Sequence, residues 1–210
     1  MCGRYYIDQE EDIAEMRRIL EEVNRRFSGT SLAARVKTGE IVPTDVVPAL
    51  SAAEDSGGAP YPTLTLMQWG MTTPQAGGVI INARSETAAE KPMFRRPVSE
   101  GRALLPASAF FEWQKNPDSR TKTKYRFSVA GDRFFYMAGL FRPERLTGTG
   151  ETINRFVIVT VPANEQMAPV HDRMPLILAR DEARRFLLDP GAALTMLASP
   201  PPCVLAAEAV

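Results

Sequence analysis

The sequence has few of the side chains that bind soft metals or form disulfides. Its 210 residues include two cysteines, Cys2 and Cys203, and one histidine, His171. A structural zinc site takes four Cys or His ligands, so these residues cannot complete one, and a disulfide-rich scaffold is excluded. We therefore expect neither a metal ion nor an organic cofactor.

Net charge and long apolar segments are also absent. The 25 acidic residues balance the 25 basic ones, of which 20 are Arg. A nucleic acid would therefore have to be held by local clusters of guanidinium groups. No apolar run approaches the roughly 20 residues of a membrane helix, and the start, MCGRYYIDQEED, lacks the apolar core of a signal peptide. We expect a protein without a membrane segment that resides in the cytoplasm, where thiols stay reduced.

The composition is that of a folded domain. Hydrophobic residues make up 44% of the chain and charged residues 24%, which is ordinary for a protein with a core. The length favours a single domain over residues 1–210. Apolar spacings of three and four predict a helix that Asp8 caps and that ends near Gly29. Shorter helices are expected at 31–38 and 181–188, and a loop at 51–60.

Strand-like segments dominate the rest of the chain. They lie at 63–69, 79–83, 102–106, 109–114, 125–130, 133–140, 155–161 and 174–178. A hairpin loop is expected at 116–123 and a turn at 147–150. So many strands with so few helices between them predict an α+β fold, with a large mixed or antiparallel, barrel-like sheet flanked by a few helices.

Cys2 is the most informative residue. A small residue after the initiator methionine favours removal of Met1, which would leave Cys2 with a free α-amine beside its thiol. An aldehyde can form an imine with that amine, and the thiol can then close a five-membered thiazolidine ring. The pKa of an α-amine is near 8, so roughly a tenth of it is neutral at pH 7. Alternatively, Cys2 is simply a small, buried apolar residue.

Two further segments place polar groups at the ends of apolar strands. In VIINARSET, Asn82 and Arg84 would share one face of a strand, and they either line a site or face solvent. In ALLPASAFFEWQ, Glu112 stands among aromatic neighbours. If its face of the strand is enclosed, burial raises the pKa of the carboxyl and suits it to proton transfer. If that face is solvated, Glu112 is an ordinary strand residue.

The lone histidine lies in APVHDRMPLIL. His171 titrates near neutrality, as acid–base catalysts commonly do, although a single histidine can equally be structural. Asp172 and Arg173 either orient the imidazole or are surface charges.

Five motifs occur in order: MCGRY at the start, WG at 69–70, INARSET at 81–87, PASAFFEW at 106–113 and HDRMP at 171–175. Together they resemble the SRAP family, the SOS response-associated peptidase proteins that shield abasic sites in DNA. The resemblance runs from residue 1 to about residue 188. It implies a protein that senses abasic sites in single-stranded DNA, acts as a monomer and crosslinks to the lesion through the amine and thiol of Cys2.

The resemblance also implies roles for individual residues. Cys2 would be the crosslinking nucleophile, Asn82 would position the opened sugar, and Glu112 and His171 would move protons. Arg4 and Arg84 would hold phosphates. The family's wedge that stacks on bases would be Trp69, with the segment 71–74 beside it.

The chain departs from the family pattern at three places. Ala109 and Phe111 replace a glycine and a tyrosine of the usual G-F-Y-E-W motif. Met-Thr-Thr-Pro-Gln follows the WG pair in place of a Pro-Trp pair. The end of the chain, 199–210, also differs, and Cys203 has no assigned role. Two alternative functions stay open: a peptidase that uses Cys2 as its N-terminal nucleophile, including self-removal of Met1, and a noncovalent binder of single-stranded DNA.

Overall fold

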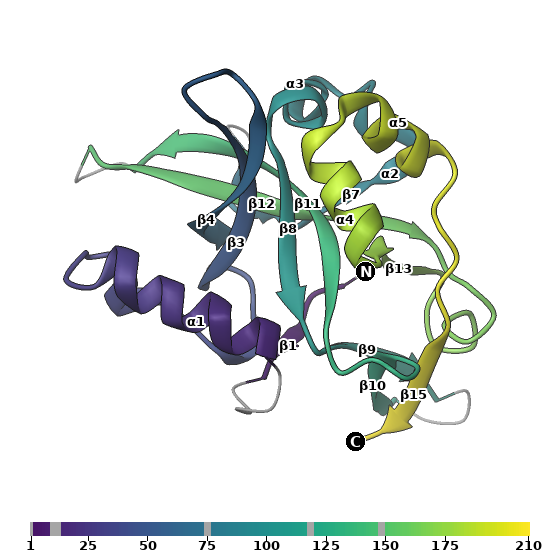
Figure 1. Cartoon of the computed structure of the whole chain (residues 1–210). Helices are drawn as coiled ribbons and strands as arrows, with labels where there is room; N and C mark the ends of the chain where they lie inside the picture. Colours follow the sequence, from purple (N-terminus) through teal and green to yellow (C-terminus); the bar gives the residue numbers. More distant parts are fainter. Residues whose placement is uncertain (1, 9–13, 74–76, 117–119, 147–149) are drawn as a thin grey trace.

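Five strands close into a mixed barrel at the centre of the fold (Figure 1). The computed structural model describes residues 2–8, 14–73, 77–116, 120–146 and 150–210. The barrel strands are β12 (Thr152–Pro162), β4 (Pro60–Trp69), β3 (Val46–Glu54), β8 (Arg102–Ala107) and β11 (Phe135–Arg145). Each pairs with the next, and β11 pairs again with β12, so the ring is complete. Only β12 and β4 run parallel among these pairs. The predicted α+β class with a mixed, barrel-like sheet is confirmed.

A second sheet carries the start of the chain. Its strands, in order, are β15 (Leu205–Ala209), β10 (Lys122–Val129), β9 (Ala109–Lys115), β1 (Tyr5–Ile7) and β2 (Gly39–Ile41). The chain passes from β8 of the barrel into β9 through one residue, Ser108, whose backbone N–H donates to the oxygen of Tyr6 over 2.9 Å. β1 therefore lies against the junction of the two sheets. This places Cys2 close to both of them.

Short strands extend the barrel near one end of β12. β7 (Asn82–Arg84) pairs in parallel with β12, and β13 (Arg173–Pro175) pairs antiparallel with it. Thr160 is in register with Arg84 on β7 and with Pro175 on β13. The remaining short strands are β5 (Met71–Thr72), β6 (Val79–Ile80) and β14 (Ile177–Leu178). Two motifs that are about 90 residues apart in the sequence, INARSET and HDRMP, thus flank the same part of one strand.

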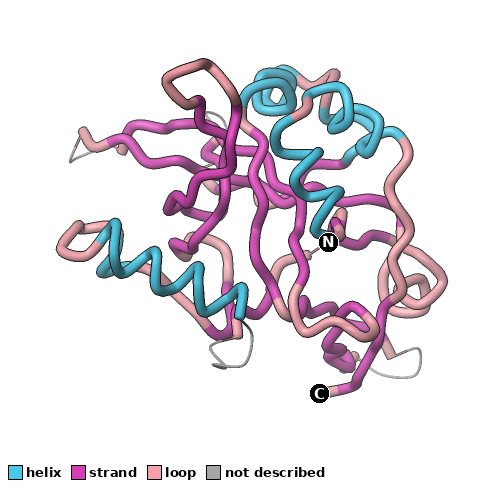
Figure 2. Tube along the Cα trace, viewed as in Figure 1, coloured by secondary structure: helices cyan, strands magenta, loops and turns pink. Residues whose placement is uncertain are grey.

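The helices form two groups, seen in cyan in Figure 2. α1 (Ala14–Phe27) buries Met16, Ile19 and Val23 at helical spacing. The others lie together on the side of the barrel away from α1. They are α2 (Ser85–Ala88), α3 (Pro92–Glu100), α4 (Arg180–Leu188) and α5 (Pro190–Ala198). A 3-10 turn, η1, spans Ala33–Arg35. None of the helices in the described ranges is both long and apolar enough to cross a membrane.

Several local predictions need correction. The helix predicted at 31–38 is only the 3-10 turn η1. The loop predicted at 51–60 is a hairpin, because β3 continues to Glu54 and β4 begins at Pro60. The strand predicted at 79–83 is broken at Ile81 into β6 and β7. The helices α2, α3 and α5 and the strand β15 were not predicted. Residues 9–13, 117–119 and 147–149, where a helix start, a hairpin loop and a turn were expected, lie outside the described residues.

Candidate functional site

Cys2 is enclosed at the entry to β1. It has no exposed surface, and its thiol lies 3.8 Å from the oxygen of Arg4. The side-chain amide of Asn82 donates to the backbone oxygen of Cys2 over 3.0 Å. Asn82 is fixed in turn by the pairing of β7 with β12, where it is in register with Ile158. The first described residue of the chain is therefore held by a side chain of the barrel.

Glu112 lies on β9, beside the entry of β1. Phe111 donates its backbone N–H to the oxygen of Arg4 over 2.9 Å, which aligns the two strands at this level. Glu112 is 5% exposed, and burial raises the pKa of its carboxyl above the usual range. Burial, and then the charge of Glu112, raise the pKa of the Cys2 thiol to about 12. Glu112 therefore lies on an enclosed face, and the thiol of Cys2 stays protonated at neutral pH.

His171 lies on the segment between β12 and β13, which a side chain of β9 holds in place. The amide of Gln114 donates to the oxygen of Pro169 over 2.9 Å, two residues before the histidine. A positive charge on His171 would lower the pKa of Glu112, against the larger effect of burial, so the two groups are electrostatically coupled. The imidazole is partly exposed, at 28%. The structure thus gathers the four predicted catalytic side chains around the start of β1.

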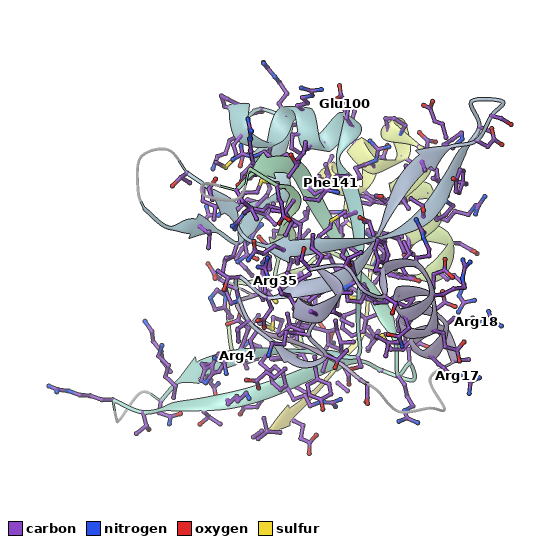
Figure 3. The ribbon with its side chains drawn as sticks, turned by 90° about the vertical axis from the view of Figure 1, so that its left-hand side faces the viewer. Arg4, Arg17, Arg18, Arg35, Glu100 and Phe141 are labelled. Carbon is purple, nitrogen blue, oxygen red and sulfur yellow. The ribbon has the colours of Figure 1, made fainter. Side chains whose placement is uncertain are left out.

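A cluster of cations and aromatic rings covers the outer side of this site. Arg4 and Lys124 both form ion pairs with Glu40, the second over 2.8 Å. The guanidinium of Arg4 lies 5.4 Å from the ring centre of Trp113, and the Lys124 ammonium lies 4.1 Å from that of Phe111. We call Arg4, Glu40, Phe111, Trp113 and Lys124 the cation–aromatic cluster. Figure 3 shows Arg4 at the opposite end of the molecule from Glu100.

Arg84 is placed differently from Arg4. It is exposed at the end of β7, two residues after Asn82. Within the described part of the chain its guanidinium forms no hydrogen bond or ion pair. An exposed guanidinium without a protein partner suits a phosphate ligand, because binding breaks no existing ion pair.

The structure does not place Trp69 at the surface, where a stacking residue was expected. It is fully buried, 5.4 Å from Tyr5 and 6.2 Å from Phe156 between ring centres, and its indole N–H donates to the oxygen of Ile81 over 2.9 Å. The next residue, Gly70, has a φ of +108°, and a Cβ there would lie 2.8 Å from Val79. The WG pair is therefore a structural motif that packs the core and turns the chain.

The neighbouring segment gives no exposed ring either. Met71 is fully buried. Residue 74, the last of the predicted 71–74 wedge, lies outside the described residues. Trp113, which is partly exposed beside Arg4, is the described tryptophan that reaches the surface near the site.

Sequence reasoning missed several residues of the site. Trp113 was noted only as a neighbour of Glu112, and Glu40, Lys124, Glu86 and Arg173 were given no partners. Glu86 and Arg173 occur within the INARSET and HDRMP motifs, and that position is the signal that pointed to them. Nothing in the sequence pairs Glu40 with Arg4, because their contact depends on the register of β1 and β2.

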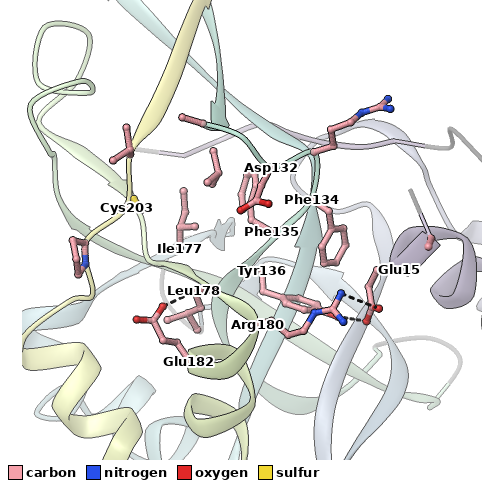
Figure 4. Close-up of a pocket in the computed structure, with 17 residues that line it drawn as sticks. Glu15, Asp132, Phe134, Phe135, Tyr136, Ile177, Leu178, Arg180, Glu182 and Cys203 are labelled. Carbon is pink, nitrogen blue, oxygen red and sulfur yellow. Dashed lines mark hydrogen bonds and ion pairs between the residues drawn. The ribbon is translucent and has the colours of Figure 1, made fainter. Parts of the chain in front are cut away.

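The site is separate from the large cavity shown in Figure 4. That cavity, of about 560 Å³, lies between β11, α4 and the segment before β15, and it contains none of the predicted catalytic residues. At its edge the hydroxyl of Tyr136 donates to Glu15 over 3.0 Å. Among the described residues, no three His, Cys, Asp or Glu side chains gather closely enough to hold a metal ion.

The barrel and the site together define a class of α+β proteins whose candidate reactive residue is a cysteine at the start of the chain. Solved structures share the fold. A protein from Bacteroides thetaiotaomicron aligns over 100% of this chain and 92% of its own, with a TM-score of 0.73 and 19% identity. One from Bordetella bronchiseptica gives a TM-score of 0.72 at 21% identity and covers 100% and 99% of the two chains.

The chain belongs to the SOS response associated peptidase (SRAP) family, whose model matches residues 1–209. The abasic site processing protein YoaM of Bacillus subtilis is 40% identical over 126 residues, which is 58% of this chain and 55% of YoaM. The abasic site processing protein YoqW of the same organism is 32% identical over 193 residues, which is 89% of this chain and 80% of YoqW. The resemblance inferred from the five motifs is confirmed.

Proposed function

We propose that this protein forms a covalent crosslink to abasic sites in single-stranded DNA through Cys2, once Met1 has been removed. The relatives YoaM and YoqW carry the name abasic site processing protein. The observation that carries the proposal is the hydrogen bond from Asn82 to the Cys2 oxygen, with the buried Glu112 carboxyl beside the same residue. Asn82 fixes the backbone next to the α-nitrogen, so the nitrogen has a defined position relative to Glu112.

The reaction would begin at the α-amine. Its neutral form attacks the C1′ aldehyde of the opened sugar, and loss of water gives an imine. Glu112, in its protonated form, donates to the departing oxygen, and His171 takes part in the proton transfer. The thiol then adds across the C=N bond: sulfur bonds to C1′ and the thiol proton passes to nitrogen. The pKa of the thiol is raised to about 12, so this step starts from the neutral thiol, whose proton must leave the sulfur as the C–S bond forms.

DNA would be held by the exposed cations around the site. Arg84 is available for one flanking phosphate. Arg4 and Lys124 can release Glu40 and bind a second phosphate in its place. Unpaired bases would stack on Trp113 rather than on Trp69, because Trp113 is partly exposed and Trp69 is buried. These contacts require no duplex. We propose that the protein acts on single-stranded DNA, and we keep the monomeric state and the cytoplasm as predictions from the sequence.

A peptidase that attacks with the Cys2 sulfur is less consistent with the site. Cysteine peptidases need a thiolate, and thiolates form where neighbouring positive charge lowers the thiol pKa. Here burial and a carboxylate raise it. Removal of Met1 by the protein itself would still account for the peptidase in the family name.

The test is a denaturing gel. The protein, with loss of Met1 verified by mass spectrometry, is incubated with single-stranded DNA that carries one abasic site. We expect a shifted band that Cys2→Ala abolishes and Cys203→Ala retains. Cys2→Ser keeps the amine and loses the thiol, so it should give a band only when borohydride reduces the imine.

Other outcomes separate the alternatives. Absence of a covalent band from protein without Met1 would overturn the proposal. DNA binding without that band would favour a noncovalent binder, and turnover of a peptide substrate would favour a peptidase.

A further inference from the structure

An ion pair between the buried Arg173 and the exposed Glu86 links the two motifs that carry Asn82 and His171. Arg173 directs both terminal nitrogens of its guanidinium at the two oxygens of Glu86, one of them over 2.8 Å. The same guanidinium donates to the oxygen of Thr160 over 2.6 Å. Thr160 is the residue of β12 that is in register with both β7 and β13. The ion pair therefore spans β12 and joins the start of α2 to the start of β13.

The geometry of this pair makes it more than a surface contact. The Arg173 side chain is only 10% exposed, whereas that of Glu86 is 46% exposed. The hydrogen bonds from Arg173 lower the pKa of Glu86 to about 2. A bidentate guanidinium–carboxylate pair fixes orientation as well as distance. The backbone at Arg173 is thus held in place by its own side chain.

That backbone acts directly on His171. The N–H of Arg173 points at the imidazole Nδ1 over 3.0 Å. A backbone amide can only donate, so Nδ1 must accept in this contact. A neutral imidazole that accepts at Nδ1 carries its proton on Nε2.

A competing neighbour favours the other tautomer. The carboxylate of Asp172 lies 2.8 Å from the same Nδ1 and would stabilise a proton there. Its side chain is 81% exposed, so water screens its charge and allows it to move away. The Arg173 amide, by contrast, belongs to a buried residue. The hydrogen bond from the Arg173 amide therefore outweighs the attraction of the Asp172 carboxylate, and Nδ1 of His171 carries no proton.

We propose that Glu86 and Arg173 are positioning residues that hold neutral His171 in its Nε2–H tautomer. In the crosslinking reaction, on which this role rests, His171 then presents an N–H donor rather than a base, and the carboxyl of Glu112 becomes the group that exchanges the proton. Loosening the ion pair lets the Arg173 amide drift from Nδ1, and Asp172 then draws the proton to that nitrogen.

The tautomer can be measured without any DNA. His171 is the only histidine in the chain, so long-range ¹⁵N–¹H correlation spectra of untagged protein report its two ring nitrogens without ambiguity. At a pH where the ring is neutral, we expect a single Nε2–H form in the wild type. Glu86→Gln and Arg173→Lys should each give a mixture that contains the Nδ1–H form.

The matched control is Glu100→Gln. It removes an ion pair with Arg96 of 2.7 Å whose side chains are 62% and 83% exposed, at the end of the molecule far from Arg4 (Figure 3). This variant should keep the wild-type tautomer. Glu86→Gln is the milder of the two test variants, because Glu86 is nearly half exposed and its amide retains one hydrogen-bond acceptor. If Arg173→Lys does not fold, Glu86→Gln alone still tests the proposal.

Crosslinking kinetics supply the second readout. Glu86→Gln should slow single-turnover crosslinking in proportion to its loss of the Nε2–H form, about twofold for an equal mixture of tautomers, with the Kd for single-stranded DNA unchanged. A wild-type ring with its proton on Nδ1, or a folded Glu86→Gln protein with the wild-type tautomer, would overturn the positioning role. The expected tautomers in a protein that never crosslinks would instead refute the proposed function and leave the assignment of the His171 tautomer standing.

Discussion

The side-chain amide of Asn82 and the backbone oxygen of Cys2 form a 3.0 Å hydrogen bond that joins residues 80 positions apart. Among the described residues, this hydrogen bond connects Cys2 to β7, which pairs with the barrel strand β12. Replacing Asn82 with Ala should therefore leave the start of β1 free to turn away from Glu112. The crosslinking rate should fall by roughly tenfold or more, and the free energy of unfolding by about 1 kcal/mol.

A matched control for Asn82→Ala exists in the same chain. Gln68 donates from its side-chain amide to the backbone oxygen of Thr44 over 2.8 Å. Gln68→Ala should cost a similar unfolding free energy in urea titrations and leave crosslinking unchanged. Equal loss of crosslinking in both variants would show that the effect comes from stability alone.

Glu112→Gln separates proton transfer from binding. The amide keeps the shape of the side chain and removes its acid, so single-turnover crosslinking should slow several-fold or more while the Kd for DNA stays nearly the same. An unchanged rate would remove Glu112 from the mechanism.

The same variant has a signature in stability against pH. The folded-state pKa of Glu112 is raised from 4.5 by burial, so the folded protein holds this proton more tightly than the unfolded chain. The wild type should therefore lose stability relative to Glu112→Gln as the pH rises above about 4.5, and the difference should be constant below it. Urea midpoints measured across acidic and neutral pH give the comparison.

Glu40→Gln should strengthen DNA binding. Glu40 pairs with both Arg4 and Lys124, so a phosphate that approaches either cation must displace it. Without this carboxylate the affinity should rise several-fold. The dependence of log K on log salt should steepen by up to about 1.4, because each additional phosphate contact on a single strand adds roughly 0.7. Glu22→Gln, which breaks an ion pair with Arg25 on α1, should change neither the affinity nor the salt dependence. A higher Kd for Glu40→Gln than for the wild type would contradict this account.

The two tryptophans should behave in opposite ways. Trp69→Phe loses the hydrogen bond to Ile81 in the core, so it should lower the unfolding free energy by about 1–3 kcal/mol and leave the Kd for DNA unchanged. Trp113→Ala should weaken binding by about 1–3 kcal/mol for a stacked base, with a smaller effect on folding. Fluorescence anisotropy and urea titration measure the two effects, and the reverse pattern would restore Trp69 as the DNA contact.

The sequence predicted four of the five barrel strands, β4, β8, β11 and β12, because their apolar residues alternate or cluster over short runs, and it did not predict β3. It misplaced Trp69 for a physical reason. Residues 66–69 at the end of β4 are all buried, so both faces of the strand are covered, and alternation does not reveal this. The segment 51–60 has a loop composition. It forms a hairpin because Asp55 accepts from the backbone of Gly57 and Ala59, and this confines the turn to a few residues.

The site was predicted as a set of residue types but not as an arrangement. Each motif supplied one reactive side chain, and resemblance supplied its role. The contacts that arrange them, such as those of Glu86 with Arg173 and of Glu40 with Arg4, join residues from separate segments of the chain. Such contacts depend on which strands become neighbours in the barrel, and periodicity within one segment carries no information about that.

Cys2 lies three residues before β1, which is paired on one side with β2 and on the other with β9. A DNA strand attached at Cys2 would hang on a tether of two residues, with a reach of roughly 7 Å. Such a short connection can extend very little. Any motor that pulled on the DNA would transmit its force directly to β1, an inner strand of the second sheet, so mechanical extraction would begin by shearing β1 from its neighbours.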